Sequence, residues 1–256
     1  MTSKHGMSSD KARRVKNRGM RKEFLFKSLL NHADVVKGNK QKRDVQTASG
    51  ITFSLKGGEE KGGGKSRDAR WQWFLLSDLS SVGRLFGASY LLNILGVFPG
   101  TRKLFEMQRA KVLPNLGHQL DVFINFLQQP KNLRTFFFST IFDGGNVDCL
   151  GIQRDDQWHI FSRDDILDFL VAGFSVQRNR NRQKTGPGEK IVFVKNSKNF
   201  AELEVRRDKK KYVSLLFTST KNTWLPALQG LHLQSLVHQK VVILYGKAMT
   251  HLGEFR

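Results

Sequence analysis

Residues 43–58 have the layout of a reaction centre for phosphate chemistry. Asp44 precedes a turn-like segment, and the β-type run at residues 51–55 is followed directly by Lys56 and two glycines. A carboxylate can hold a divalent cation, and a lysine beside it can stabilise negative charge that develops on a phosphate. We therefore take Asp44 as a candidate metal ligand and Lys56 as a candidate catalytic lysine. Glu23, on a helix expected before them, is a candidate second carboxylate.

The composition favours a folded protein with a polyanionic partner. Hydrophobic residues make up 39% of the 256 residues, and the 20 phenylalanines among them can fill a substantial core. Lys and Arg outnumber Asp and Glu by 43 to 22, which gives a net charge of +21. Such a charge is unfavourable on a compact surface unless a polyanion binds to it. We therefore expect nucleic acid as the partner, and the alternatives are an anionic membrane surface and a charge that only keeps the protein in solution.

The cysteine content and the hydropathy pattern argue against several other classes of protein. Cys149 is the only cysteine in the sequence, which excludes a disulfide framework and a cysteine-based zinc site and fits a reducing cytosol. No apolar run approaches the roughly 20 residues that a membrane span needs. The first residues are polar and basic and lack the apolar segment of a secretory signal. The expected location is the cytoplasm, with no membrane partner.

The hydrophobic patterns predict a helix before Asp44 and a mixture of strands and helices after it. Residues 21–30 have helical spacing, and residues 51–55 and 71–76 have β-type spacing. We expect the latter two strands to be neighbours in one sheet, together with the strand that starts at Asp44. Further helices are expected at residues 79–95, 101–109, 116–129 and 162–170, and further strands at 134–142, 147–153, 157–161, 191–194, 201–206, 211–218 and 241–245.

The spacing of the acid and the lysine resembles a known nuclease motif. Asp44, nine intervening residues and then Ser54-Leu55-Lys56 are similar to the PD-(D/E)XK motif of type II restriction endonucleases. That family has an α/β core with a mixed central sheet, uses Mg²⁺, and carries an acid-x-lysine pair on its second catalytic strand. The resemblance implies that Asp44 binds the metal and that Lys56 is the catalytic lysine. Arg43 stands where the motif has proline, and Ser54 stands where it has the second acid.

The serine at position 54 requires another acid in the metal site. Some restriction enzymes of this class have a serine there and take the missing carboxylate from elsewhere. In this sequence the possible substitutes are Glu23, Glu59, Glu60 and Asp68. Glu23 ranks first, because a helix holds a side chain more rigidly than a glycine-rich loop does. The resemblance covers roughly residues 20–76.

Residues 177–184 form a polar loop in which long basic and amide side chains alternate. Arginine can pair with guanine, and asparagine and glutamine with adenine, while all of them can contact phosphates. We expect this loop to enter a DNA groove, and a loop that simply faces solvent is the alternative. The candidate DNA-binding residues are Arg178, Asn179, Arg180, Asn181, Arg182 and Lys184.

A second set of acids could form a rival centre. It comprises Asp143, Asp148, Glu202 and Glu204, with Arg206 two residues after the last of them. Asp143 and Asp148 lie more than fifty residues before Glu202 and Glu204 in the sequence. We favour the alternative that this region is a sheet whose charged residues form salt bridges.

Together these observations predict an α/β (α+β) protein with a mixed central sheet flanked by helices and a mainly β C-terminal half. We expect a basic flexible arm at residues 1–20, a nuclease core at 21–130, and a region at 131–256 that completes the fold and reads DNA. The expected activity is Mg²⁺-dependent, sequence-specific cleavage of double-stranded DNA, by a homodimer if the site is palindromic. The alternatives are a non-catalytic nucleic-acid-binding protein and a metal-independent DNA glycosylase.

Overall fold

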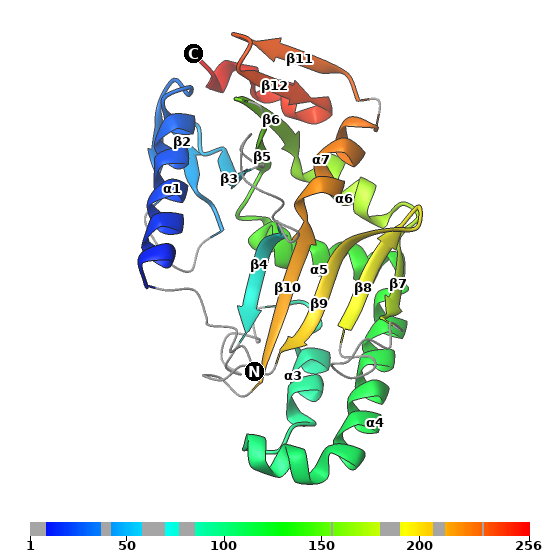
Figure 1. Ribbon diagram of the computed structural model, residues 1–256. Coiled ribbons are helices and arrows are strands. Elements are labelled where there is room, and N and C mark those ends of the chain that lie inside the picture. Colours follow the sequence, from blue (N-terminus) through cyan, green and yellow to red (C-terminus); the bar gives the residue numbers. More distant parts are fainter. Residues whose placement is uncertain are drawn as a thin grey trace. The chain divides into compact units, whose positions relative to one another are not determined.

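The chain forms two compact units that are interleaved in the sequence. The computed structural model describes residues 9–36, 42–57, 70–76, 85–154, 156–179, 190–206, 213–231 and 233–256 (Figure 1). Unit 1 comprises Met1–Gly63, Asn146–Arg163 and Leu233–Arg256, and unit 2 comprises Gly64–Gly145 and Asp164–His232. The two predicted regions at 21–130 and 131–256 therefore do not correspond to the units, because each of them contributes strands to both.

Unit 1 is built on a mixed sheet of seven strands in the order β1-β2-β3-β5-β6-β12-β11. β3 is parallel to β5, and β6 is parallel to β12, while the other neighbours are antiparallel. Parallel neighbours need a long connection, and here both connections run through unit 2. The elements are α1 (Ser9–Lys27), β1 (Ala33–Val35), β2 (Val45–Thr47), β3 (Thr52–Gly57), β5 (Cys149–Arg154), β6 (Gln157–Ser162), β11 (Ser235–His238), β12 (Val242–Tyr245) and η2 (Gly246–Glu254).

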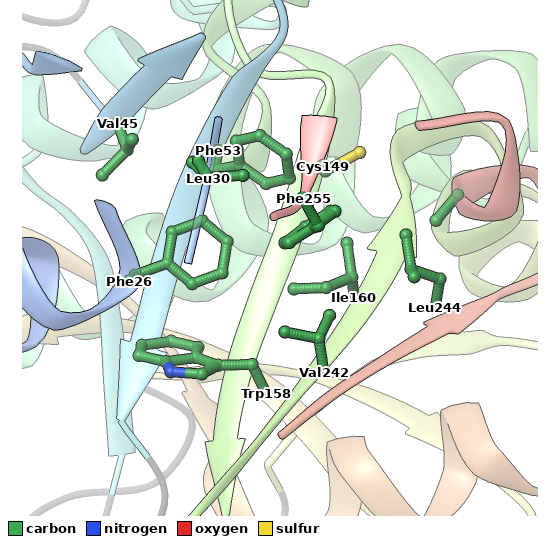
Figure 2. Close-up of a cluster of buried hydrophobic side chains, with 11 residues drawn as sticks. Phe26, Leu30, Val45, Phe53, Cys149, Trp158, Ile160, Val242, Leu244 and Phe255 are labelled. Atoms are coloured by element: carbon green, nitrogen blue, oxygen red, sulfur yellow. The ribbon is translucent and has the colours of Figure 1, made fainter. Parts of the chain in front are cut away.

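One face of this sheet carries an aromatic cluster that anchors α1 (Figure 2). Phe26 on α1 is fully buried, and its ring centroid lies 5.2 Å from that of Phe53 on β3 and 4.8 Å from that of Trp158 on β6. The ring of Phe255, which follows η2, lies 6.1 Å from the rings of both Phe26 and Phe53. Three distant stretches of sequence therefore meet in one core, and this core fixes the position of α1.

Unit 2 is built on an antiparallel sheet of five strands in the order β4-β10-β9-β8-β7. Phe136 on α5 stacks against Phe193 on β8 and meets Phe217 on β10 edge-on, with all three side chains fully buried. The strands are β4 (Arg70–Leu76), β7 (Ser175–Arg178), β8 (Lys190–Lys195), β9 (Lys198–Arg206) and β10 (Ser214–Thr220). The helical elements are α3 (Ala88–Gly96), α4 (Arg102–Leu127), α5 (Pro130–Ile141), η1 (Asp143–Gly145), α6 (Arg163–Val171) and α7 (Lys221–Gln229). The fold is thus α+β, as the sequence predicts.

Residues 134–142 were expected to form a buried strand, and this prediction is wrong. They form most of helix α5, which starts at Pro130, where the missing proline N–H costs no intrahelical hydrogen bond. The run of three phenylalanines favours a strand by composition. The buried positions nevertheless follow a helical spacing of three and four residues, at Leu133, Phe136, Phe137, Thr140 and Ile141.

Three further expectations about the elements need correction. The strand at residues 71–76 exists as β4, but it belongs to the sheet of unit 2 and is not a neighbour of β3. The expected flexible arm at residues 1–20 is helical from Ser9 onwards, as part of α1. The two helices expected at 101–109 and 116–129 are one continuous helix, α4, which contains Pro114.

Glu202 on β9 shows how unit 2 holds a buried charge. Its side chain is 8% exposed, and its carboxylate pairs with Arg70 and, at 3.2 Å, with Lys190. Asn199 Nδ2 donates to the other carboxylate oxygen at 2.7 Å. Burial raises the pKa of Glu202, but Lys190 and Arg70 more than offset this effect, so that the pKa lies below its usual value. This arrangement is the salt-bridged sheet that we favoured over a rival catalytic centre.

We expect Glu202→Gln to destabilise the protein at neutral pH by roughly 1–3 kcal/mol, the usual range for hydrogen bonds to charged groups. Because the folded pKa is depressed, the charged pair stabilises the fold above the unfolded pKa of about 4.3 and loses this effect as the pH falls through the folded value. Urea titrations of both proteins at pH 7 and pH 3 should therefore show a difference that shrinks at pH 3. Glu106→Gln, at an exposed position on α4, is the control. An equal difference at both pH values would contradict the argument.

Candidate active site

The edge of β3 next to β2 is completed by the side chain of Asp44. β2 pairs with β3 only as far as Val45 and Phe53, and the Asp44 N–H then donates to the Phe53 carbonyl oxygen at 2.8 Å. Beyond this point the Leu55 N–H donates to Asp44 Oδ2 at 2.5 Å. The Asp44 carboxylate thus occupies the place of a strand acceptor and is fixed directly before the start of β2.

Ser54 and Lys56 lie on the face of β3 opposite to the aromatic core. Phe53 and Leu55 contribute to that core, and side chains alternate between the two faces of a strand. Ser54 is buried, and its Oγ lies 3.5 Å from Asp44 Oδ2. Lys56 interacts electrostatically with Asp44. The acid and the lysine that the sequence singled out are therefore brought together.

Glu23 approaches the same place from α1. It lies three residues before the anchored Phe26 and is partly buried. Burial raises the pKa of Glu23, and the negative charge of Asp44 raises it further. Such repulsion is strong only between charges that are close to each other. Helix α1 therefore carries a second carboxylate that interacts electrostatically with Asp44.

The environment of Asp44 suits a carboxylate that shares a cation. Burial raises the pKa of Asp44, and although Lys56, the Leu55 N–H and the Ser54 hydroxyl all lower it, the pKa stays above its usual value. A divalent cation between Asp44 and Glu23 would relieve both their repulsion and their loss of solvation. Carboxylate oxygens are also the ligands that Mg²⁺ prefers. The donor set therefore fits Mg²⁺.

The described residues supply two acids to this site and not three. Across the described ranges, His, Cys, Asp and Glu form no group of three or more that could hold a metal ion. Mg²⁺ commonly binds through one or two carboxylates and completes its shell with water and substrate phosphate. Two acids are therefore sufficient for such a site. The other predicted substitutes, Glu59, Glu60 and Asp68, lie outside the described residues.

The predicted DNA-reading loop is only partly described. Arg178 is the last residue of β7, and its Nη1 donates to the Gly117 carbonyl oxygen at 3.1 Å and to Asp121 Oδ2 at 2.7 Å. Both partners are on α4, so the guanidinium joins β7 to that helix. The Asn179 N–H donates to the Lys190 carbonyl oxygen. The remaining candidates lie outside the described residues: Arg180, Asn181, Arg182 and Lys184.

Asp148, one of the rival acids, makes its contacts within unit 1. Asp148 Oδ2 accepts hydrogen bonds from the Thr52 N–H at 3.0 Å and the Thr52 hydroxyl at 2.8 Å, and its other oxygen pairs with Arg163. These contacts join β3 to β5. Asp148 belongs to unit 1, whereas Glu202 and Glu204 belong to unit 2. Asp148 therefore has a structural role.

Lys22 is a further basic residue beside β3, and the sequence did not single it out. Lys22 Nζ lies 2.8 Å from the point that a Cβ atom at Gly57 would occupy, directly after Lys56 in β3. Its position next to Glu23 in the sequence was the only available signal, because nothing in the hydrophobic pattern shows which turn of α1 crosses the end of β3.

No helix within the described ranges is both long and apolar enough to cross a lipid bilayer.

Comparison with known proteins gives no independent assignment. Family models, curated proteins and solved structures were all compared with the chain, and none of them matches it.

Proposed function

We propose that unit 1 is a Mg²⁺-dependent nuclease that hydrolyses phosphodiester bonds in double-stranded DNA. The observation that supports this most strongly is the position of Asp44. Its carboxylate is held at the open edge of β3 by the Leu55 N–H, and both Glu23 and Lys56 interact with it electrostatically. These residues come from different elements of unit 1, and their types are those that phosphodiester hydrolysis requires.

Each residue of the site has a distinct role in this proposal. Asp44 and Glu23 hold the cation, and Ser54 helps to orient Asp44 through its hydroxyl. Mg²⁺, when bound, supplies activation of a water molecule and neutralisation of the leaving oxygen. The Lys56 ammonium stabilises the negative charge that develops on the scissile phosphate. Ser54 is buried and Asp44 is partly buried, which limits competition from bulk water for these interactions.

The order of the elements supports a nuclease of the PD-(D/E)XK restriction type. A helix with a glutamate, an aspartate beside β2, and Ser-x-Lys on the neighbouring β3 follow one another in the chain. The net charge of +21 supports DNA as the substrate. A palindromic recognition sequence would be cut by a symmetric homodimer with one site per strand.

A plasmid assay tests the proposal directly. Supercoiled DNA is incubated with the protein in Mg²⁺ and, separately, in EDTA, and the products are separated on a gel. We expect discrete fragments in Mg²⁺ alone. A mobility shift without cleavage would instead identify a non-catalytic DNA-binding protein, and strand or base loss in EDTA would identify metal-independent chemistry such as that of a glycosylase.

Lys56→Ala should reduce the rate of cleavage by roughly 100- to 1000-fold, as expected when one stabilising donor is lost from a transition state. Binding of the same DNA in EDTA should change little, because one charge among many is removed. Both rates and affinities are measured on one linear fragment. Lys131→Ala removes the same charge at an exposed position on α5 and should cleave at the normal rate. If Lys56→Ala cleaves as fast as this control, Lys56 is not catalytic.

A further inference from the structure

Lys22 crosses the end of β3 because residue 57 is a glycine. A Cβ atom at position 57 would lie 2.8 Å from Lys22 Nζ and 3.7 Å from Lys22 Cδ and Cε. Real Cβ atoms essentially never approach another heavy atom to less than 3.0 Å, so any larger residue would displace the ammonium group. The φ angle of Gly57 is not positive, and the glycine is therefore not required by the backbone. Its effect is to leave room for Lys22.

The ammonium groups of Lys22 and Lys56 lie on opposite faces of the same strand end. Gly57 has the same parity along β3 as Phe53 and Leu55, which face the aromatic core and α1, whereas Lys56 is on the other face. Asp44 lies at the open edge between the two faces, where it bonds to the Leu55 N–H. A polyanion that crosses this edge can therefore meet one lysine on each side of the carboxylate.

The neighbouring strand adds a hydrogen-bond acceptor on the Lys22 side. Gln153 on β5 is in register with Gly57, and paired residues in parallel strands share a face. Its Oε1 is buried and has no hydrogen-bond partner among the described residues. A cation, and an acceptor that has no partner among the described residues, thus lie on the same side of the strand end, beside the same glycine.

We propose that Lys22 binds the DNA phosphate adjacent to the scissile one, and that Gly57 provides the space for this contact. The inference builds on the proposed nuclease function and adds a second phosphate position to it. Lys56 then stabilises charge at the phosphate that reacts, and Lys22 fixes the register of the backbone relative to Asp44. Two protein contacts to one DNA strand restrict the rotation of that DNA strand more than a single contact does. This favours the aligned geometry of the scissile phosphate that hydrolysis needs.

The test uses the full chain and one linear double-stranded fragment. Binding is measured in EDTA at several salt concentrations, and cleavage in Mg²⁺. A plot of log affinity against log salt has a negative slope, and Lys22→Gln should reduce its magnitude by about one, the value for a single lost phosphate contact. Cleavage should become roughly tenfold slower, as positioning of the backbone is lost. Lys27→Gln is the matched control, because it removes the same charge from α1 at a lysine that pairs with Asp34.

Gly57→Ala provides a second test, in which no charge is removed from the protein. Only the far end of a flexible side chain must move, so the stability should hardly change, while the ammonium leaves its position. Cleavage should slow as in Lys22→Gln, and the double variant should be no slower than either single variant, since both remove one interaction.

The outcomes separate this inference from the nuclease assignment. Absence of Mg²⁺-dependent cleavage by the wild-type protein would overturn the proposed function itself. If the wild type cleaves normally, three results would each overturn only the role of Lys22. They are an unchanged salt slope in Lys22→Gln, an equal change of slope in Lys27→Gln, and normal cleavage by Gly57→Ala.

Discussion

Replacing Asp44 by asparagine is expected to lower the rate of DNA cleavage by a factor of about 1000 or more. A bound cation contributes several kcal/mol to stabilisation of the transition state, and each 1.36 kcal/mol corresponds to about tenfold in rate. Asparagine keeps the shape of the side chain and an oxygen that can accept the Leu55 N–H, a hydrogen bond of 2.5 Å in the native protein. The substitution removes the negative charge but keeps the hydrogen bond at the strand edge, so the loss of rate reports on binding of the cation.

Two measurements make this experiment decisive. Cleavage is followed at saturating DNA over a range of Mg²⁺ concentrations, and Mn²⁺ binding without DNA is measured by calorimetry. Asp44→Asn should weaken Mn²⁺ binding as well as cleavage. Asp34→Asn removes a carboxylate whose side chain is 93% exposed and should behave as the wild type. Cleavage by Asp44→Asn within tenfold of the wild-type rate would show that Asp44 does not hold the metal.

Phe26→Ala is expected to have the largest effect on the fold of unit 1. Truncation of a buried phenylalanine costs about 3–5 kcal/mol, because apolar burial is lost and a cavity remains. Phe26 is fully buried and contacts the rings of Phe53, Trp158 and Phe255, which come from three separate stretches of the chain. Glu23 is one helical turn away, so that loosening of α1 should also displace a proposed metal ligand.

Urea titration followed by circular dichroism measures the loss of stability, and the plasmid assay measures the loss of cleavage. Phe24→Ala is the matched control, because Phe24 is on the same helix with its side chain 56% exposed. It should change the stability by less than about 0.5 kcal/mol, as surface substitutions usually do. Equal effects of the two substitutions would show that α1 does not pack on the sheet through Phe26.

The proximity of Asp44, Ser54 and Lys56 was easier to predict from the sequence than the order of the strands in the sheets was. Asp44, Ser54 and Lys56 are close in the sequence, and the antiparallel pairing of β2 with β3 across a short turn brings them together. The partners of the longer-range pairings could not be predicted. β4 pairs with β10, which starts more than a hundred residues later, and hydrophobic periodicity gives the type of an element but not its neighbour.

The strand expected at residues 134–142 shows a related limit. Three consecutive phenylalanines satisfy the composition of a buried strand, but a helix buried along most of its surface can have the same composition. The choice between them depends on the length of the apolar segment and on Pro130 at its start, which favours a helix. In the same way, the position of Lys22 over Gly57 depends on how α1 is rotated on the sheet, and that rotation follows from Phe26, Phe53 and Phe255 packing together.

The interleaving of the two units has a consequence for the order in which the protein matures during translation. Chains emerge from the ribosome with the N-terminus first, and domains generally fold as whole units. Unit 2 ends at His232, but unit 1 needs β11, β12 and the ring of Phe255, which all follow unit 2 in the sequence. The residues of the proposed site, Glu23, Asp44, Ser54 and Lys56, are thus made before unit 2 but become ordered only after it. A nascent chain would not complete the core that positions the proposed site until synthesis had passed residue 255.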